Sequence, residues 1–158
     1  MNGSRSVSLG GLDVVFRVTG EETNGALAVV EHPIEPGVLV PPHVHEREDE
    51  LTYVIEGEIG ARIGEQERPS LRPGQYLWKP RGVPHAFWNA SAAPARILDA
   101  IIPAGFERFF DELATLLARG AGDDEIDEAG RRYGHVIVPE WIPELEERYG
   151  VTARGKRV

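Results

Sequence analysis

The sequence contains no cysteine, and this absence limits the chemistry that it can support. Without cysteine the chain can form no disulfide and can offer no thiolate to a metal ion. Histidine imidazoles and carboxylates are therefore the strong side-chain ligands that remain. Any metal site predicted from this sequence must use nitrogen and oxygen ligands.

Long apolar runs and a basic character are also missing. No stretch approaches the roughly 20 apolar residues that a membrane-spanning helix needs, and the first ten residues, "MNGSRSVSLG", lack the apolar segment of a secretion signal. The net charge of −9 and the pI near 5.0 argue against binding to nucleic acid or to an anionic membrane, because both rely on basic patches. We therefore expect a cytoplasmic protein that binds neither.

The pattern of apolar residues divides the 158-residue chain into two parts. Before residue 104, short runs rich in valine, isoleucine, leucine and aromatic residues alternate with glycine and proline, which is typical of the strands and turns of a β-sandwich or barrel. After Pro103 the spacing becomes helical, with apolar residues at Phe106, Phe109, Phe110, Leu113, Leu116 and Leu117. We predict an all-β domain over residues 1–103 and a C-terminal helical extension of the same domain over residues 104–158.

Two further helices are expected in the extension. The segment "DDEIDEAGRRYG" (123–134) begins with acidic residues and ends with arginines followed by Gly134, as the helix dipole and the preferred C-terminal cap require. A final turn of helix is expected around "PELEERYG" (143–150). The sequence does not decide whether the helices act as a lid or as a support.

The stretch "GVLVPPHVHEREDELTYVIEG" (37–57) carries the first chemically informative pattern. His43 and His45 are two residues apart, so in a strand their side chains point to the same face. Glu50 opens the next strand, where Thr52 and Val54 share its facing. A strand that returns antiparallel would bring Glu50 opposite the two histidines.

The stretch "GQYLWKPRGVPHAFWN" (74–89) carries the second pattern. His85 begins another strand and should face the same interior as the first two histidines, together with Phe87. In the preceding strand, parity leaves two alternatives for the inward pair, Tyr76 with Trp78 or Gln75 with Leu77, and we favour the aromatic pair. The predicted pocket lining is therefore Val40, Thr52, Val54, Tyr76, Trp78 and Phe87.

At every defining position the two stretches resemble the two sequence motifs of the cupin superfamily. The resemblance is close from residue 37 to residue 89 and looser over the strands from about residue 12 to residue 102. It implies a double-stranded β-barrel, or jelly roll, and a metal site made of His43, His45, Glu50 and His85. His32 and His135 belong to neither motif, so we expect them to be ordinary core or surface residues.

Three imidazoles and one carboxylate suit one divalent ion per chain, which can be Fe, Mn, Ni, Co, Cu or Zn. They leave one or two coordination positions for water or substrate, as catalytic metal sites do. Ligand type does not choose among these metals.

The resemblance implies an oxidoreductase similar to the small dioxygenase cupins, such as the quercetinase-like group. A hydrophobic or aromatic hydroxy- or diketo-compound would chelate the metal next to dioxygen, with Glu50 as ligand and possible catalytic base. Two alternatives stay open: a non-redox cyclase or isomerase that uses the metal as a Lewis acid, and a small-molecule binding module without turnover. The resemblance also implies a homodimer.

Overall fold

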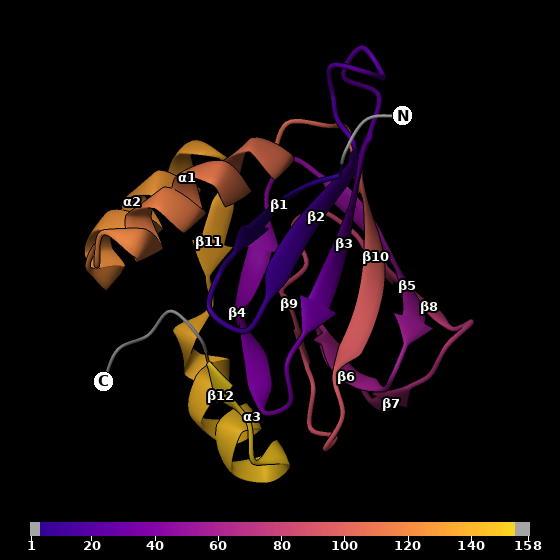
Figure 1. The fold of residues 1–158 in the computed structure, drawn as a ribbon. Helices are drawn as coiled ribbons and strands as arrows, with labels where there is room; N and C mark the ends of the chain where they lie inside the picture. The colour runs from indigo at the N-terminus through magenta and orange to yellow at the C-terminus, as the bar shows by residue number, and fades with distance from the viewer. Residues whose placement is uncertain (1–3, 154–158) are drawn as a thin grey trace.

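The computed structural model describes residues 4–153, so the first three residues of the predicted barrel and the last five of the predicted extension lie outside it. Two mainly antiparallel sheets face each other (Figure 1). The first sheet has the order β1 (Arg5–Ser8), β2 (Asp13–Val18), β3 (Ala28–Ile34), β10 (Ala95–Ile102), β5 (Asp49–Glu56) and β8 (Tyr76–Lys79). The second sheet has the order β11 (His135–Ile137), β4 (Val38–His45), β9 (His85–Trp88), β6 (Ile59–Ile63) and β7 (Gln66–Leu71), with β12 (Thr152–Ala153) paired in parallel to β4.

From β3 to β10 the chain passes back and forth between the two sheets, as in a jelly roll. Side chains alternate along each strand, and every second residue of β10 is buried between the sheets. The core between the sheets is aliphatic, with Val14, Val30, Val54 and Ile97 fully buried. The predicted all-β jelly roll with a C-terminal helical region is confirmed.

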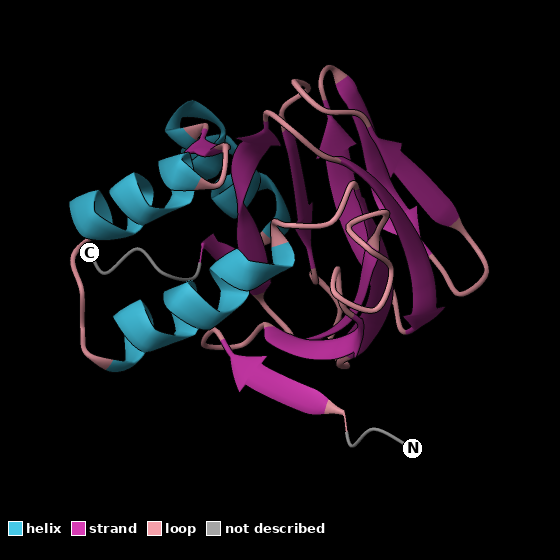
Figure 2. Ribbon diagram, turned by 90° about the horizontal axis from the view of Figure 1, so that it is seen from above, coloured by secondary structure: helices cyan, strands magenta, loops and turns pink. Residues whose placement is uncertain are grey.

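The helices are α1 (Glu107–Ala118), α2 (Asp123–Arg132) and α3 (Ile142–Tyr149), with a 3₁₀ turn at Pro139–Trp141. They gather on one side of the strands (Figure 2). The apolar stripe of α1 packs on the barrel core through Phe109, Phe110 and Leu116. The buried carboxylate of Glu107 accepts a hydrogen bond from the backbone N–H of Gly20 at 3.0 Å, which ties the start of α1 to the loop before β3. None of the helices among the described residues has the length and apolar character that a membrane crossing requires.

The C-terminal extension also contributes strands, which differs from the purely helical extension predicted. Strand β11 pairs antiparallel with β4, placing His135 opposite His45, and β12 pairs with Val38 and Leu39. Runs of three and two residues are too short to show an alternating pattern, so no sequence pattern predicts these strands. Because β4 carries two predicted metal ligands, the extension is in direct contact with the site.

Trp88 anchors α3 to the outer face of the second sheet. Its ring is fully buried and stacks on Tyr149 with the ring centroids 4.4 Å apart. Across the sheet, Gly60 faces Trp88 in the β6–β9 register, and a Cβ atom at position 60 would lie 2.2 Å from the Trp88 Nε1 atom. Any side chain at position 60 would therefore push the indole out of place.

We expect Gly60→Ala to lower the free energy of unfolding by about 1–3 kcal/mol, the usual cost of overfilling a packed core. Chemical denaturation followed by tryptophan fluorescence measures this change. Gly122→Ala is the matched control, because a Cβ atom at position 122 meets nothing within 4 Å. Equal stabilities for the two variants would show that the close approach of Gly60 to Trp88 is not required.

Candidate metal centre

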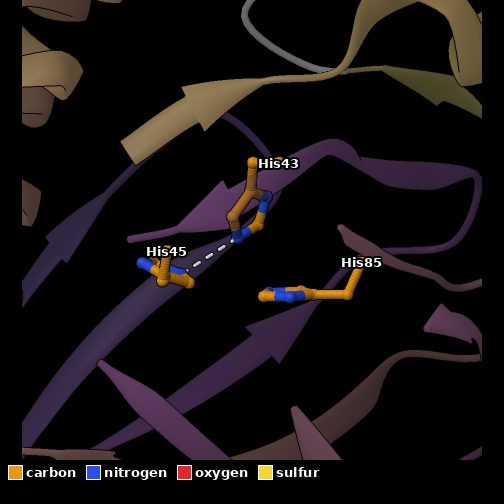
Figure 3. Close-up of side chains that lie close together, drawn as sticks. All are labelled: His43, His45 and His85. Carbon is orange, nitrogen blue, oxygen red and sulfur yellow. Dashed lines mark hydrogen bonds between the residues drawn. The ribbon is translucent and has the colours of Figure 1, made fainter. Parts of the chain in front are cut away.

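Strands β4 and β9 bring three histidines to one point inside the barrel. His43 and His45 lie two residues apart on β4, and the β4–β9 register sets His85 directly opposite His43. One ring nitrogen from each histidine lies within 4.8 Å of the other two (Figure 3). All three side chains are buried. The predicted convergence of these residues is confirmed.

Backbone carbonyls fix which ring nitrogens face inward. His43 Nδ1 lies 2.7 Å from the Pro41 carbonyl oxygen, and His85 Nδ1 lies 3.4 Å from that of Val83. A carbonyl can only accept a hydrogen bond, so His43 Nδ1 carries the proton and its Nε2 atom keeps a lone pair. His43 Nε2 and His45 Nε2 approach to 3.1 Å (Figure 3).

The histidines are held in the form that binds metals. Burial lowers the pKa of His43, and it lowers the pKa values of His45 and His85 well below their usual range, with the neighbouring His43 adding to the effect. Neutral imidazoles with free lone pairs are the form that coordinates a divalent ion.

Glu50 reaches the same point from β5 on the opposite sheet. Its Oε1 atom lies 3.5 Å from His45 Nε2, and its Oε2 atom lies 3.5 Å from His85 Nε2. Oε2 also lies 2.7 Å from the ammonium nitrogen of Lys79. Glu50 is thus close enough to complete a metal site while it forms a buried ion pair. Its role as a fourth ligand stays a prediction.

Lys79 is 3% exposed and connects Glu50 to a second carboxylate. Its ammonium nitrogen lies 3.4 Å from both carboxylate oxygens of Asp99 on β10. Burial alone would lower the pKa of Lys79, but the charges of Asp99 and Glu50 and their hydrogen bonds outweigh burial and raise it. The ammonium therefore stays charged inside the barrel.

Asp99 is held in turn by two further side chains. The Thr52 hydroxyl donates a hydrogen bond to Asp99 Oδ1, and His32 Nε2 lies 3.5 Å from Asp99 Oδ2. His32 also bonds the Asp13 carbonyl oxygen through Nδ1 at 3.0 Å. His32 is thus a hydrogen-bonded core residue, as predicted, and it also lines the cavity beside Asp99.

Three buried polar atoms near the cluster lack a hydrogen-bond partner, namely His85 Nε2, His45 Nδ1 and Glu48 Oε2. Burying a ring nitrogen without a partner costs free energy, and a metal bound by His85 Nε2 would remove that cost. The three neutral imidazoles and the adjacent carboxylate therefore fit a divalent ion. His45 Nδ1 faces Glu48 Oε2 at 3.9 Å, and burial together with the charge of Glu50 raises the pKa of Glu48 to about 7.

His43 and His45 of the cluster, together with Glu50 and Lys79, form the polar end of a cavity of about 150 Å³. Its walls come from β4 and β9 and also from α1, α2 and β11, so the C-terminal extension closes the barrel on this side. Phe106, just before α1, packs on the His45 ring with the centroids 4.2 Å apart. The helices are therefore part of the pocket.

Four of the predicted lining residues lie on the inner face. Val40 and Phe87 line the cavity as predicted. Thr52 and Val54 face inward with Glu50, but they do not reach the cavity, so their prediction as lining residues is wrong. Thr52 is occupied by Asp99, and Val54 is part of the core between the sheets.

Tyr76 and Trp78 face solvent, so their prediction as lining residues is also wrong. They are 66% and 50% exposed, whereas Leu77 and Lys79 on the same strand are buried. The β5–β8 register explains this difference, because it pairs Glu50 with Lys79, and directly paired residues share a face. The inward facing of Glu50 forces Tyr76 and Trp78 outward, where they lie opposite the exposed Tyr53 and Leu51. The homodimer stays a prediction.

His135 was predicted to be an ordinary residue, but it lies against the cluster. Its ring centroid is 4.6 Å from that of His43 and 5.6 Å from that of His45, and it lines the cavity. Burial lowers the pKa of His135 well below its usual value. No motif places position 135 near β4, so no sequence pattern predicts this contact. Asp99 was also not predicted as a site residue. It lies at an inward-facing position of the eight-residue strand β10, and this facing was the one sequence signal that could have identified it.

Comparison with known proteins identifies the barrel. A family model described as a cupin domain matches residues 31–101. The transcriptional regulator PuuR of Escherichia coli is 34% identical over 83 residues, which cover 52% of this chain and 44% of the regulator. The tetracenomycin polyketide synthase protein TcmJ of Streptomyces glaucescens is 35% identical over 82 residues, which cover 51% of this chain and 52% of TcmJ. The chain thus spans about half the length of these curated relatives.

The fold agrees with this assignment. A crystal structure of an RmlC-like cupin from Shewanella frigidimarina superposes with a TM-score of 0.58 at 21% identity, covering 66% of this chain and 88% of that one. At this level of identity the match shows the fold alone. Together with the two motifs and the jelly roll, the family match shows that residues 31–101 form a cupin domain.

Proposed function

We propose that this protein is a metal-dependent enzyme acting on a small oxygen-containing organic compound, and that its reaction is a dioxygenation. The observation that carries the proposal is the convergence of three neutral imidazoles, two of which, His43 and His45, line the polar end of an apolar cavity. Such a donor set suits Fe, Mn, Ni, Co, Cu or Zn and leaves room for a substrate. A divalent metal bound there would supply Lewis acidity and, where it is redox-active, the electron transfer that dioxygen chemistry requires.

Glu50 is the residue that would take a proton from the substrate. Oε2 is held by Lys79 at 2.7 Å, while Oε1 faces the converging ring nitrogens. A carboxylate in that position can accept the proton of an enolic or phenolic hydroxyl group. Because Lys79 fixes one oxygen, the other is already oriented before the substrate arrives.

The cavity walls would orient the organic part of the substrate. Val40 and Phe87 from the barrel and Phe106 and Phe110 from the extension present apolar surface beside the histidines. Such a lining binds a hydrophobic or aromatic body and keeps bulk water away from the reacting atoms.

Two alternatives have support of their own. The buried Lys79–Glu50 pair places a proton donor beside a proton acceptor, which also suits a non-redox cyclase or isomerase, and TcmJ is named for a polyketide synthase. The similarity to PuuR supports a ligand-binding module without turnover. The three candidate functions differ in what they require. A dioxygenase requires oxygen and substrate, a cyclase or isomerase requires substrate alone, and a binding module requires only a ligand.

We expect the purified protein to hold close to one divalent metal ion per chain, and His85→Ala to weaken metal binding at least about 100-fold, because it removes a direct ligand. Elemental analysis after desalting measures the content. His135→Phe is the matched control: it keeps an aromatic ring against His43 but removes the imidazole. Equal loss of metal in both variants would show that packing around His43, and not coordination by His85, holds the ion.

We expect the metal-loaded protein to consume dioxygen when given a small β-diketone or a one-ring hydroxylated aromatic compound. An oxygen electrode measures uptake, and product formation is assayed in parallel with and without oxygen. Product formed equally well without oxygen would contradict dioxygenation and support the cyclase or isomerase. If a ligand raises the thermal stability of the protein and no product forms with or without oxygen, the result would support the binding module.

A further inference from the structure

The outer face of the first sheet carries an apolar patch that no element among the described residues covers. The large apolar side chains exposed within residues 4–153 are Leu51, Tyr53, Tyr76 and Trp78, and each keeps between 37% and 66% of its surface accessible. They lie together on β5 and β8, where the register pairs Leu51 with Trp78 and Tyr53 with Tyr76. Single exposed apolar residues are common, but a contiguous group of them indicates a contact surface.

The patch continues onto the neighbouring strands. On β10, the partly buried Leu98 and Ala100 pair with Tyr53 and Leu51. On β3, the partly buried Val29 pairs with Ala100. The apolar area thus extends across four adjacent strands, from β3 through β10 and β5 to the edge strand β8.

The outer face of the second sheet is different, because α3 covers it and Trp88 is fully buried beneath that helix. The helices lie on the side of the molecule away from β5 and β8 (Figure 1). Within the described residues, the first sheet therefore lacks the layer that an apolar sheet face needs in order to be buried. A second copy of the same face can supply that layer, since two sheets pack face to face about 10 Å apart.

The charges on this face favour a second copy of the chain as its partner. Arginines and carboxylates flank the patch in ion pairs, namely Arg17–Glu31, Arg96–Glu31, Arg96–Glu56 and Arg81–Asp49. Together with Asp13, this side of the sheet holds three arginines and four carboxylates, a net charge of −1, whereas the chain carries −9. Two copies with that charge repel each other over most of their surface, but a nearly neutral face with both signs can meet itself without this cost.

The exposed area is large enough for the centre of an interface. At about 200 Å² for a fully accessible aromatic side chain, Tyr53, Tyr76 and Trp78 together present about 300 Å². Leu51 and the apolar residues of β10 and β3 enlarge this centre. A specific interface buries about 800 Å² on each partner, with an apolar centre inside a polar rim. The flanking ion pairs lie where such a rim is needed.

We propose that the outer face of the first sheet is the contact surface of a homodimer, in which two copies pack this face together about a two-fold axis. The aromatic side chains of β5 and β8 form the centre, and the flanking arginines and carboxylates form the rim. The surface lies on the opposite side of the sheet from Glu50 and Lys79. The inference therefore does not depend on the proposed function.

Sedimentation velocity over a range of protein concentrations tests the dimer. We expect the wild-type protein to have twice the 17.4 kDa mass of the chain and to shift toward the single-chain mass on dilution. Trp78→Glu should raise the dissociation constant at least about 100-fold, because it removes an aromatic anchor and would bury an unpaired charge. A wild-type protein that is monomeric at every concentration, or a Trp78→Glu variant as dimeric as the wild type, would overturn the proposal.

Ser70→Glu is the matched control. Ser70 is exposed on β7, the edge strand of the second sheet, so the variant adds the same charge away from the patch. It should dimerise like the wild type. Equal weakening by Ser70→Glu and Trp78→Glu would show that the added charge, and not its place on the first sheet, prevents association.

Hydroxyl-radical labelling of the wild-type protein locates the interface without any substitution, so the result does not depend on the folding of a variant. Oxidation of Tyr76, which is 66% exposed in the single chain, should fall severalfold at concentrations that favour the dimer. Tyr133 is the internal control, because it is partly exposed at the end of α2, away from the patch, and its oxidation should not change. Protection of Tyr133 with no protection of Tyr76 would assign the interface to the extension and overturn the proposal.

Discussion

The pairing of β4 with β9 is the contact on which the site depends. It sets His43 opposite His85, and the alternation of side chains along β4 then brings His45 to the same face. Both strands are buried on two faces: the barrel core covers the inner one, and α3 covers the outer one through Trp88. A shift of one residue in this pairing would turn the histidines of one of the two strands away from the interior. The packing of Trp88 against Gly60 and Tyr149 thus maintains the geometry of a site on the opposite face of the same sheet.

Charge inside the barrel is balanced in a chain of contacts. Glu50 is compensated by Lys79, Lys79 by Asp99, and Asp99 by hydrogen bonds with Thr52 and by the nearby His32. Each member would be costly to bury alone, and removing one leaves its neighbour unpaired. This balance allows a carboxylate to face three neutral imidazoles in a cavity whose remaining walls are apolar. The C-terminal extension completes the arrangement, because α1 and β11 cover the side of the barrel where the histidines lie.

The sequence was most informative where the site follows from local alternation. His43, His45, Glu50 and His85 belong to two contiguous stretches. Period-two alternation predicts that His43 and His45 share a face, and the resemblance to the two cupin motifs implies the complete set of four. The inward facing predicted for Tyr76 and Trp78 was wrong. The prediction placed the aromatic pair inside because of its hydrophobicity and did not use the pairing of residues between β5 and β8. Because Lys79 pairs with Glu50 across β5 and β8, it is Leu77 and Lys79 that face inward on β8, the reverse of the prediction. A lysine side chain usually prefers solvent, so its burial between two carboxylates was not expected.

Contacts between distant parts of the chain were not predictable in the same way. Asp99 meets Lys79 only because β10 lies beside β5, and His135 reaches His43 only through a three-residue strand. The helical face of α1 was predicted, but the spacing does not show that it lines a cavity. X-ray absorption at the zinc edge of protein loaded with one equivalent of zinc tests the central claim most directly. The account predicts a coordination shell with about three imidazole nitrogens and light oxygen donors, visible through the multiple scattering of the rings. A shell of oxygens without imidazole scattering would contradict it.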